Sequence, residues 1–348
     1  MSEATTARRR AAVYVANADS GDIAVFTLDG ASGDLVEVQR FATGGAVMPL
    51  AVSPDRRVLY ASIRSEPYRV GSLAIDAASG CLDEIGSAPL PASSCWISTD
   101  SSGRFLLSAS YGSSLVAVSP IGPGGIAGAA QQVVATDANA HSIRTDPGSN
   151  RFAFVACLGG GVVRQMRFDA VSGRLSDNDP PAWRARAGAG PRHFTFHPRL
   201  GIVYLLNELD ASLDVIAVDR DRGMLGAVLE TASLLPPGFA AGAPWAAELH
   251  LTPDARFLYA SERRSSTLAS FAVDAELGTL TPLASTPTEA EPRGFAITPD
   301  GRFLLAVGQA SHRLSRYAID ASSGALTRLG DQPVGRNPNW VEIVELPD

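Results

Sequence analysis

The sequence has little of what usually marks a metal, redox or membrane protein. Its 348 residues include only three cysteines, Cys81, Cys95 and Cys157, with no Cys-x-x-Cys or His-Glu-x-x-His motif. Neither a disulfide framework nor a zinc site is therefore indicated, and the odd, unpatterned cysteines suit a reducing compartment. No stretch of 18 apolar residues occurs, so we expect no membrane-spanning helix. We also expect no metal and no cofactor.

Basic clusters and leader sequences are equally scarce. The formal net charge is −7 and no Lys/Arg run extends beyond Arg8–Arg10, which argues against a nucleic-acid partner. Residues 1–6 contain neither an apolar core nor a small-residue cleavage site, so we expect no signal peptide and a cytoplasmic protein with no membrane partner. A Gly-x-Ser-x-Gly motif is also absent, and a serine-hydrolase interpretation therefore has no nucleophile.

What the sequence does contain is a motif that recurs about every 46 to 56 residues. Its first half is a strand, a Pro-Asp turn and a second strand, with the clearest copies at 50–62, 251–261 and 297–307. Its second half is an Asp-x-x-x-Gly-x-Leu hairpin, which starts at Asp29, Asp76, Asp169, Asp219, Asp274 and Asp320. A degenerate copy at 121–126 fills the one double gap, which brings the copies to seven.

The segments between the turns have the pattern of short strands. Segments such as 71–76 and 267–274 run apolar or alternate, are rich in Val, Ile, Leu, Ala and Phe, and are separated by Gly and Pro. We find no long helical stripe free of Gly or Pro. Four short strands per repeat, seven times, predict an all-β fold, the seven-bladed β-propeller. A β-sandwich would not produce a fixed period along the whole chain.

The phase of the repeat predicts how the ring closes. The chain opens with 12–17, which matches the second strand of a blade, and ends with 339–346, which matches an innermost first strand. We therefore expect the C-terminal strand to pair with the N-terminal blade, which leaves no long open edge. Residues 12–348 are expected to form a single propeller domain, preceded by a disordered tail at 1–11.

Polar side chains collect at one end of the repeat. The innermost strand of a blade and its neighbour are antiparallel, so the start of the first and the end of the second lie at the same mouth. These positions hold His141, Arg192, His193, Glu248 and Arg293 at strand starts, and Arg64, Asn207, Glu208 and Gln309 at strand ends. One such residue is usually a solvated rim residue, but several converging favour a ligand site. The surplus of arginine points to an anionic ligand, since the guanidinium matches phosphate and carboxylate oxygens.

Several segments spread along the chain closely resemble the bacterial propeller-type 6-phosphogluconolactonases. They are 53–55, 97–100, 190–198, 204–209, 244–254, 291–295 and 308–312. That family also includes the fungal 3-carboxy-cis,cis-muconate lactonizing enzymes. The resemblance implies a cytosolic, metal-independent enzyme of carbohydrate metabolism, which hydrolyses 6-phosphoglucono-1,5-lactone to 6-phosphogluconate in the pentose phosphate pathway.

The resemblance also implies where the pocket lies. The pocket motifs of the family fall on His141, Arg192, Glu208 and Arg293, which also stand among the residues at the mouth. We expect His141 or Glu208 to be the general base, Arg293 to stabilise the oxyanion and Arg192 to bind the anionic part of the substrate. The remaining expected substrate-binding residues are His193, Asn207, Arg64, Glu248 and Gln309.

Three segments depart from the enterobacterial pattern and leave alternatives open. These are Cys95-Trp96, Ser110-Tyr111-Gly112 and 157–161, and each change removes polar groups from one side of the mouth. Another anionic lactone, such as a carboxymuconolactone, is therefore an alternative substrate, in the hydrolytic or the lactonizing direction. A metal-dependent sugar lactonase and a non-catalytic propeller that serves as a binding platform are further alternatives. The expected partner is a small anionic lactone, and the expected state is a monomer or weak dimer.

Overall fold

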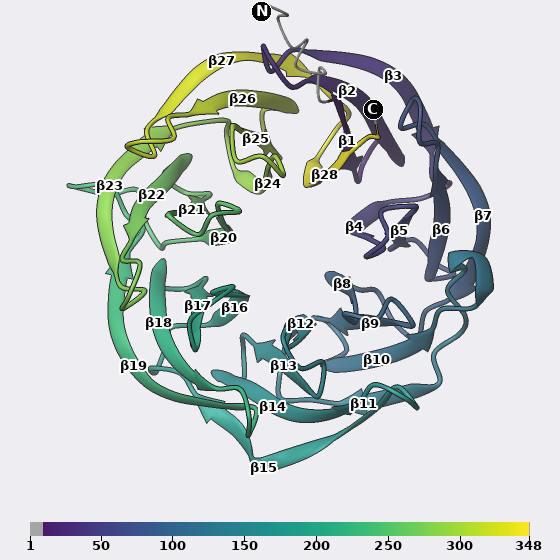
Figure 1. Cartoon of the computed structure of the whole chain (residues 1–348), viewed down its shortest axis with the longest axis vertical. Coiled ribbons are helices and arrows are strands. Elements are labelled where there is room, and N and C mark those ends of the chain that lie inside the picture. Colours follow the sequence, from purple (N-terminus) through teal and green to yellow (C-terminus); the bar gives the residue numbers. More distant parts are fainter. Residues whose placement is uncertain (1–9, 348) are drawn as a thin grey trace, which may run out of the picture.

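The computed structural model describes residues 10–347 as seven antiparallel four-stranded sheets, arranged as blades around a ring (Figure 1). From the inside outward, blade 1 consists of β28 (Pro338–Glu345), β1 (Arg10–Asn17), β2 (Asp22–Asp29) and β3 (Leu35–Ala42). Blade 2 consists of β4 (Val47–Val52), β5 (Val58–Ile63), β6 (Arg69–Ile75) and β7 (Leu82–Pro89). Blade 3 consists of β8 (Trp96–Thr99), β9 (Phe105–Ser110), β10 (Leu115–Pro120) and β11 (Gln132–Ala135), with the 3₁₀ turn η1 (Pro123–Gly125) between its last two strands.

The other four blades repeat this order. Blade 4 consists of β12 (Ala140–Thr145), β13 (Phe152–Cys157), β14 (Val162–Asp169) and β15 (Arg174–Arg184). Blade 5 consists of β16 (Pro191–Phe196), β17 (Ile202–Asn207), β18 (Ser212–Asp219) and β19 (Met224–Ser233). Blade 6 consists of β20 (Ala246–Leu251), β21 (Phe257–Glu262), β22 (Thr267–Val273) and β23 (Leu280–Pro287). Blade 7 consists of β24 (Pro292–Ile297), β25 (Phe303–Gly308), β26 (Arg313–Ile319) and β27 (Leu326–Pro333).

The ring closes as the phase of the repeat predicted. β28 pairs antiparallel with β1, with Ala11 opposite Glu345 and Val15 opposite Val341, so that strands from the two ends of the chain complete blade 1. The seven-bladed all-β prediction is therefore confirmed. The first strand begins at Arg10, earlier than the predicted position 12 because β1 pairs along its whole length with β2. Residues 1–9 of the expected tail lie outside the described residues.

The recurring Asp-x-x-x-Gly motif forms the turn of the hairpin between the two outer strands of a blade. In blade 2 the Asp76 carboxylate accepts hydrogen bonds from the backbone N–H groups of Ala78 and Ser79, at 3.2 and 2.8 Å. The Gly80 N–H then donates to the Asp76 carbonyl at 2.7 Å. Gly80 has φ +76°, a left-handed conformation that glycine adopts without steric cost. These two requirements explain the fixed Asp-to-Gly spacing in the sequence.

A tyrosine on the second strand of four blades connects that blade to the next. The hydroxyl of Tyr204 donates to the carbonyl of Gly278 at 2.8 Å, and Tyr14, Tyr60 and Tyr259 make the same bond to the next hairpin glycine. Burial raises the pKa of the Tyr204 hydroxyl well above its ordinary value, so it remains a donor. Phe154 occupies the corresponding position in blade 4 and instead packs its ring on Phe196, 5.6 Å away. The contacts between blades thus combine apolar packing with hydrogen bonds, and the tyrosine bond recurs in four of them.

We expect Tyr204→Phe to lower the free energy of unfolding by about 1–3 kcal/mol, because the buried Gly278 carbonyl would lose its partner. The measurement is urea-induced unfolding followed by circular dichroism. Tyr68→Phe is the matched control, since the Tyr68 hydroxyl bonds Glu66 at the surface. Equal stability of the two variants would contradict a role for the inter-blade bond.

Candidate functional site

Bulges at the starts of the innermost strands direct charged side chains to one mouth of the ring. The ladder between β12 and β13 skips His141, the ladder between β16 and β17 skips Arg192, and the ladder between β24 and β25 skips Arg293. A β-bulge leaves one residue unpaired and turns its side chain away from the regular alternation. Three of the four residues that carry the family resemblance are therefore bulge residues at equivalent points of three blades.

The fourth, Glu208, lies between two buried arginines. It follows β17, and its Oε2 accepts hydrogen bonds from Arg192 Nε at 2.6 Å and from Arg263 Nη2 at 3.0 Å. The side chains of Arg192 and Arg263 are 1% and 2% exposed, so this carboxylate balances charge that water cannot reach. Arg263 also donates to the carbonyls of Trp245 and Ala246 and stacks on the Trp245 ring.

Two histidines and a carboxylate form a continuous hydrogen-bonded row. Glu248 Oε1 lies 3.0 Å from His193 Nδ1, and His193 Nε2 lies 3.2 Å from His141 Nδ1. All three side chains are buried. We assign the proton of His193 to Nδ1, which faces the Glu248 carboxylate, so that Nε2 accepts. His141 Nδ1 and Arg192 Nη1 both lie 3.2 Å from this Nε2, and we assign its lone pair to the Nδ1–H of His141. The row therefore leaves a lone pair on His141 Nε2, which has no hydrogen-bond partner among the residues that the structure describes.

Burial keeps both histidines neutral. It is the largest cause that lowers the pKa of His141 and of His193 well below 6.5, and the charge of Arg192 adds to it in both cases. Arg192 Nη1 lies 3.1 Å from His193 Nδ1 and 3.2 Å from its Nε2, so that this charge is in contact with the ring. A neutral His141 at ordinary pH can accept a proton from water.

Arg293 and Arg64 are the cationic groups of the mouth that remain available. Arg293 is partly buried, and within residues 10–347 its guanidinium makes no hydrogen bond or ion pair. Burial and then the charge of Arg192 lower its pKa to about 10. Arg64 directly follows β5 and is exposed, and within residues 10–347 its side chain makes one hydrogen bond, from Nε to Ser93 Oγ at 3.1 Å. Unpaired guanidinium groups near each other favour an anionic ligand.

Other predicted substrate-binding residues have partners of their own. Asn207 Nδ2 bonds Ser212 and Asp214, which fixes the turn after β17, and Gln309 Nε2 bonds Asn337 Oδ1 at 2.7 Å. Their role in binding stays a prediction. Sequence reasoning missed Arg263, although it directly follows Glu262, which ends β21 at the mouth. The chain contains no lysine, so arginine and histidine supply all cationic side chains of the site.

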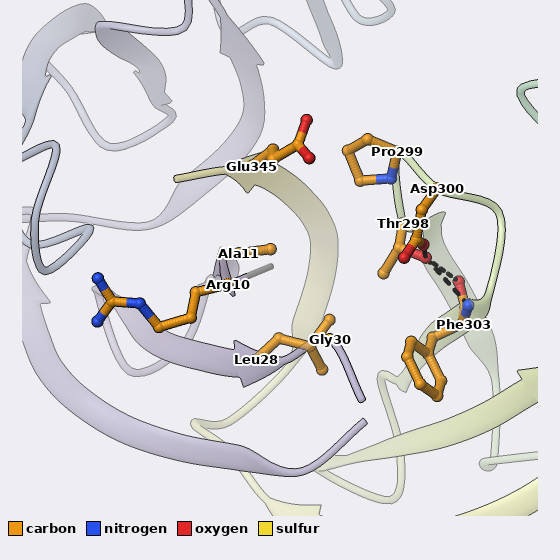
Figure 2. A pocket seen from close by; sticks show the side chains of 9 residues that line it. All are labelled: Arg10, Ala11, Leu28, Gly30, Thr298, Pro299, Asp300, Phe303 and Glu345. Atoms are coloured by element: carbon orange, nitrogen blue, oxygen red, sulfur yellow. Dashed lines mark hydrogen bonds between the residues drawn. The ribbon is translucent and has the colours of Figure 1, made fainter. Parts of the chain in front are cut away.

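Hollows elsewhere on the molecule lack this chemistry. A cavity of about 20 Å³ lies between blades 1 and 7. Figure 2 shows the side chains that line it, among them Leu28, Phe303 and the turn that holds Pro299 and Asp300. This turn follows β24, at the opposite end of that strand from Arg293. The cavity has room for about one water and contains no histidine. We therefore place the candidate site at the mouth.

Among residues 10–347 no group of three or more His, Cys, Asp and Glu side chains is arranged to hold a metal ion. No helix in the described part of the chain has the length and apolar character needed to cross a membrane.

Known proteins resemble the whole propeller. The model of the family described as lactonase, seven-bladed β-propeller, matches residues 10–343. A 6-phosphogluconolactonase of Pectobacterium carotovorum is 42% identical over 285 residues, 82% of this chain and 84% of that protein. One of Serratia proteamaculans is 40% identical over equal shares. The structure of the periplasmic gluconolactonase of Pseudomonas aeruginosa superposes with a TM-score of 0.90 at 30% identity, over 97% of this chain and 100% of that one.

The hydrogen-bonded row predicts the protonation of its histidines. At pH 6, where an ordinary imidazole is largely protonated, we expect His141 and His193 to be neutral and to carry the proton on Nδ1. Imidazole ¹⁵N chemical shifts measure both properties, with the urea-unfolded protein as control. Because the unfolded chain binds these protons and the folded chain does not, stability should fall as the pH drops below about 6.5. A pKa of 6.5 or higher for either residue would contradict the arrangement.

Proposed function

The chain belongs to the lactonase family of seven-bladed β-propellers, and on this basis we propose that it hydrolyses 6-phosphoglucono-1,5-lactone to 6-phosphogluconate. Membership in the family confirms the resemblance that the sequence motifs indicated. The observation that carries the proposal is the open Nε2 of His141 at the end of the row from Glu248, in the same mouth as the unpaired Arg293. An ester carbonyl needs a base for water and a cation for the oxyanion, and these two groups supply them.

His141 is the better general base of the two that the sequence left open. Oε2 of Glu208 already accepts hydrogen bonds from two buried arginines, so it is committed to holding them and is not directed at a water molecule. His141 has a free ring nitrogen, and the positive charge that it acquires is stabilised by Glu248 through His193. We assign Glu208 to holding Arg192 and Arg263 in place.

The reaction then proceeds in two steps. His141 Nε2 takes a proton from a water molecule as the water oxygen bonds to the lactone carbonyl carbon, and Arg293 stabilises the resulting oxyanion. The tetrahedral intermediate collapses with cleavage of the bond between that carbon and the ring oxygen. The ring oxygen receives the proton from His141 and becomes a hydroxyl, and the new carboxylic acid ionises. The first step leaves His141 protonated, and the second returns it to the neutral form, ready for the next turnover.

The phosphate is assigned to Arg64. The sequence pointed to Arg192 for the anionic part of the substrate, but Arg192 is buried, and Glu208 and the carbonyl of Ala247 already bind its guanidinium. Arg64 is exposed, and the one hydrogen bond of its side chain in the described part of the chain goes to Ser93. A phosphate monoester with its negative charges would therefore extend from the catalytic groups toward blade 2.

The relatives bear on the alternatives. Those described above are named lactonases, and their names give no support to a carboxymuconolactone substrate or to a binding platform. The Pseudomonas neighbour is named a periplasmic gluconolactonase, so the phosphate requirement is the property that most needs testing. A cytoplasmic location is part of the proposal and is supported by the free cysteines Cys81, Cys95 and Cys157, which suit a reducing compartment.

Substitution of the two candidate bases separates their roles. We expect His141→Asn to lower kcat about 10²–10⁴-fold with little change in stability, because it removes the proton acceptor. Glu208→Gln should lower both kcat and the free energy of unfolding, since two buried guanidinium groups would lose their carboxylate. Lactone hydrolysis in a pH-indicator assay and urea unfolding give the two quantities. Near-normal turnover by His141→Asn would refute its role as base.

Substitution of Arg64 tests the phosphate assignment. Arg64→Gln should raise KM for 6-phosphoglucono-1,5-lactone about 10–100-fold, through loss of a charge-assisted hydrogen bond, and leave kcat/KM for unphosphorylated gluconolactone unchanged. Arg56→Gln is the control, because Arg56 is an exposed arginine in the turn after β4 that pairs with Glu345. An equal effect of Arg64→Gln on both lactones would argue against a phosphate contact.

A further inference from the structure

A second group of charged and aromatic side chains lies on the innermost strands next to the row. We call it the inner cluster: Trp96, Arg144, Trp340 and Glu342, from β8, β12 and β28 (Figure 1). The guanidinium of Arg144 lies 4.7 Å from the centre of the Trp96 ring. The Trp96 ring in turn meets the His193 ring edge to face, at 4.5 Å between ring centres. Arg144 therefore reaches the middle histidine of the row through one tryptophan.

The other half of the inner cluster reaches the same histidine from blade 1. Trp340 Nε1 donates to Glu342 Oε1 at 2.9 Å, which fixes the indole ring. The Trp340 ring lies 5.3 Å from the Trp96 ring and 6.3 Å from the His193 ring, both in tilted edge-to-face arrangements. His193 is thus enclosed by two indoles, each of which has its own charged neighbour.

Packing alone does not account for these charged residues. Burial lowers the pKa of Arg144, and its buried Nε has no hydrogen-bond partner among the residues that the structure describes. The buried Nε1 of Trp96 has none there either. Unsatisfied buried donors cost stability, and a hydrophobic residue at position 144 would avoid that cost. A charge kept at such a cost beside a candidate active site is best explained by its effect on that site.

We propose that Arg144 and Glu342 are positioning residues for the proposed lactonase reaction, which hold the His193 ring, through Trp96 and Trp340, in the orientation that bonds both Glu248 and His141. The inference rests on the proposed function. His193 can bond Glu248 and His141 at the same time only when both partners lie close to the plane of its ring. A ring that rotated freely would lose these two hydrogen bonds. The two indoles prevent that rotation, and Arg144 and Glu342 fix the indoles.

The inner cluster also sets the charge around the row. After burial and Arg192, the charge of Arg144 lowers the pKa of His193, followed by Arg293 and His250. Glu248 opposes these cations through its hydrogen bond to Nδ1, and His141 faces Nε2. Removal of Arg144 should therefore raise the pKa of His193. Burial raises the pKa of Glu342 to about 7, against the opposing effect of Arg144, so Glu342 ionises within the working range of the proposed reaction.

Two variants and one control test the proposal. Arg144→Met and Glu342→Gln keep the approximate size of each side chain while removing its charge. Thr195→Val is the control, because Thr195 lies two residues after His193 on β16 and its hydroxyl makes no hydrogen bond among the described residues. The readouts are kcat and KM for 6-phosphoglucono-1,5-lactone across pH 5–9, and the ¹⁵N chemical shifts of the imidazoles.

A positioning role predicts a specific pattern. Both variants should lower kcat about tenfold with KM unchanged, and Arg144→Met should move the acid limb of the kcat profile to higher pH. Because the pKa of Glu342 is about 7, we expect an inflection near that pH in the unmodified protein and its loss in Glu342→Gln. In both variants the His193 Nδ1 tautomer should no longer be the single form, whereas Thr195→Val should match the unmodified protein throughout.

The outcomes separate this inference from the proposed function. Unchanged ¹⁵N shifts and pH profiles in both variants would overturn the positioning role, even if the protein is an active lactonase. Changed imidazole shifts in a protein that hydrolyses no lactone would support the control of the His193 ring and refute the proposed function. If Arg144→Met fails to fold, Arg144→Lys replaces it, because lysine keeps a positive charge at this position. The proposal would then be supported by an unaltered His193 tautomer and pH profile in Arg144→Lys, together with changes in both in Glu342→Gln.

Discussion

The pairing of β28 with β1 is the interaction on which the rest of the structure depends. It makes a ring from strands at opposite ends of the chain, and so brings the starts of all seven innermost strands to one mouth. It also bears directly on the candidate site, since Trp340 of β28 contacts both Trp96 and His193. An unclosed ring would leave β1 as an open edge and would remove one wall of the histidine row.

The site combines neutral and charged groups that burial would otherwise make costly. Glu208 neutralises two guanidinium groups in a buried position, while Glu248 binds an imidazole that stays neutral until a proton arrives. The two carboxylates differ because their partners differ. Glu208 is paired with arginines, which carry a permanent charge, whereas Glu248 is bonded to a histidine, which would gain charge only during the proposed reaction. Within residues 10–347 the Arg293 guanidinium has no hydrogen-bond or ion-pair partner. In the proposed reaction, the oxyanion that forms on the substrate would become that partner.

The sequence predicted the ring and much of the mouth, because both follow from period and phase. The Asp-to-Gly spacing marks the hairpins. Residues at equivalent strand starts lie at the same end of their blades, and on this basis His141 and Arg293 were predicted to lie at the mouth. The period of the repeat does not show which side chains form hydrogen bonds or ion pairs with each other. The sequence left open whether Glu208 or His141 is the base, and only the two arginines beside Glu208 distinguish them. Arg144 and Glu342 were missed because they lie inside strands, where an isolated charge has no recognisable pattern.

The most direct test of this mechanism is a crystal structure of the His141→Asn variant with 6-phosphogluconate bound. We expect the carboxylate at C1 to lie between position 141 and the Arg293 guanidinium, with the phosphate within hydrogen-bond distance of Arg64. We also expect Glu208 to bond Arg192 and Arg263 as it does in the free protein. A product molecule bound at the other end of the ring, or at the mouth with its phosphate at position 141, would contradict the assignment of the catalytic groups.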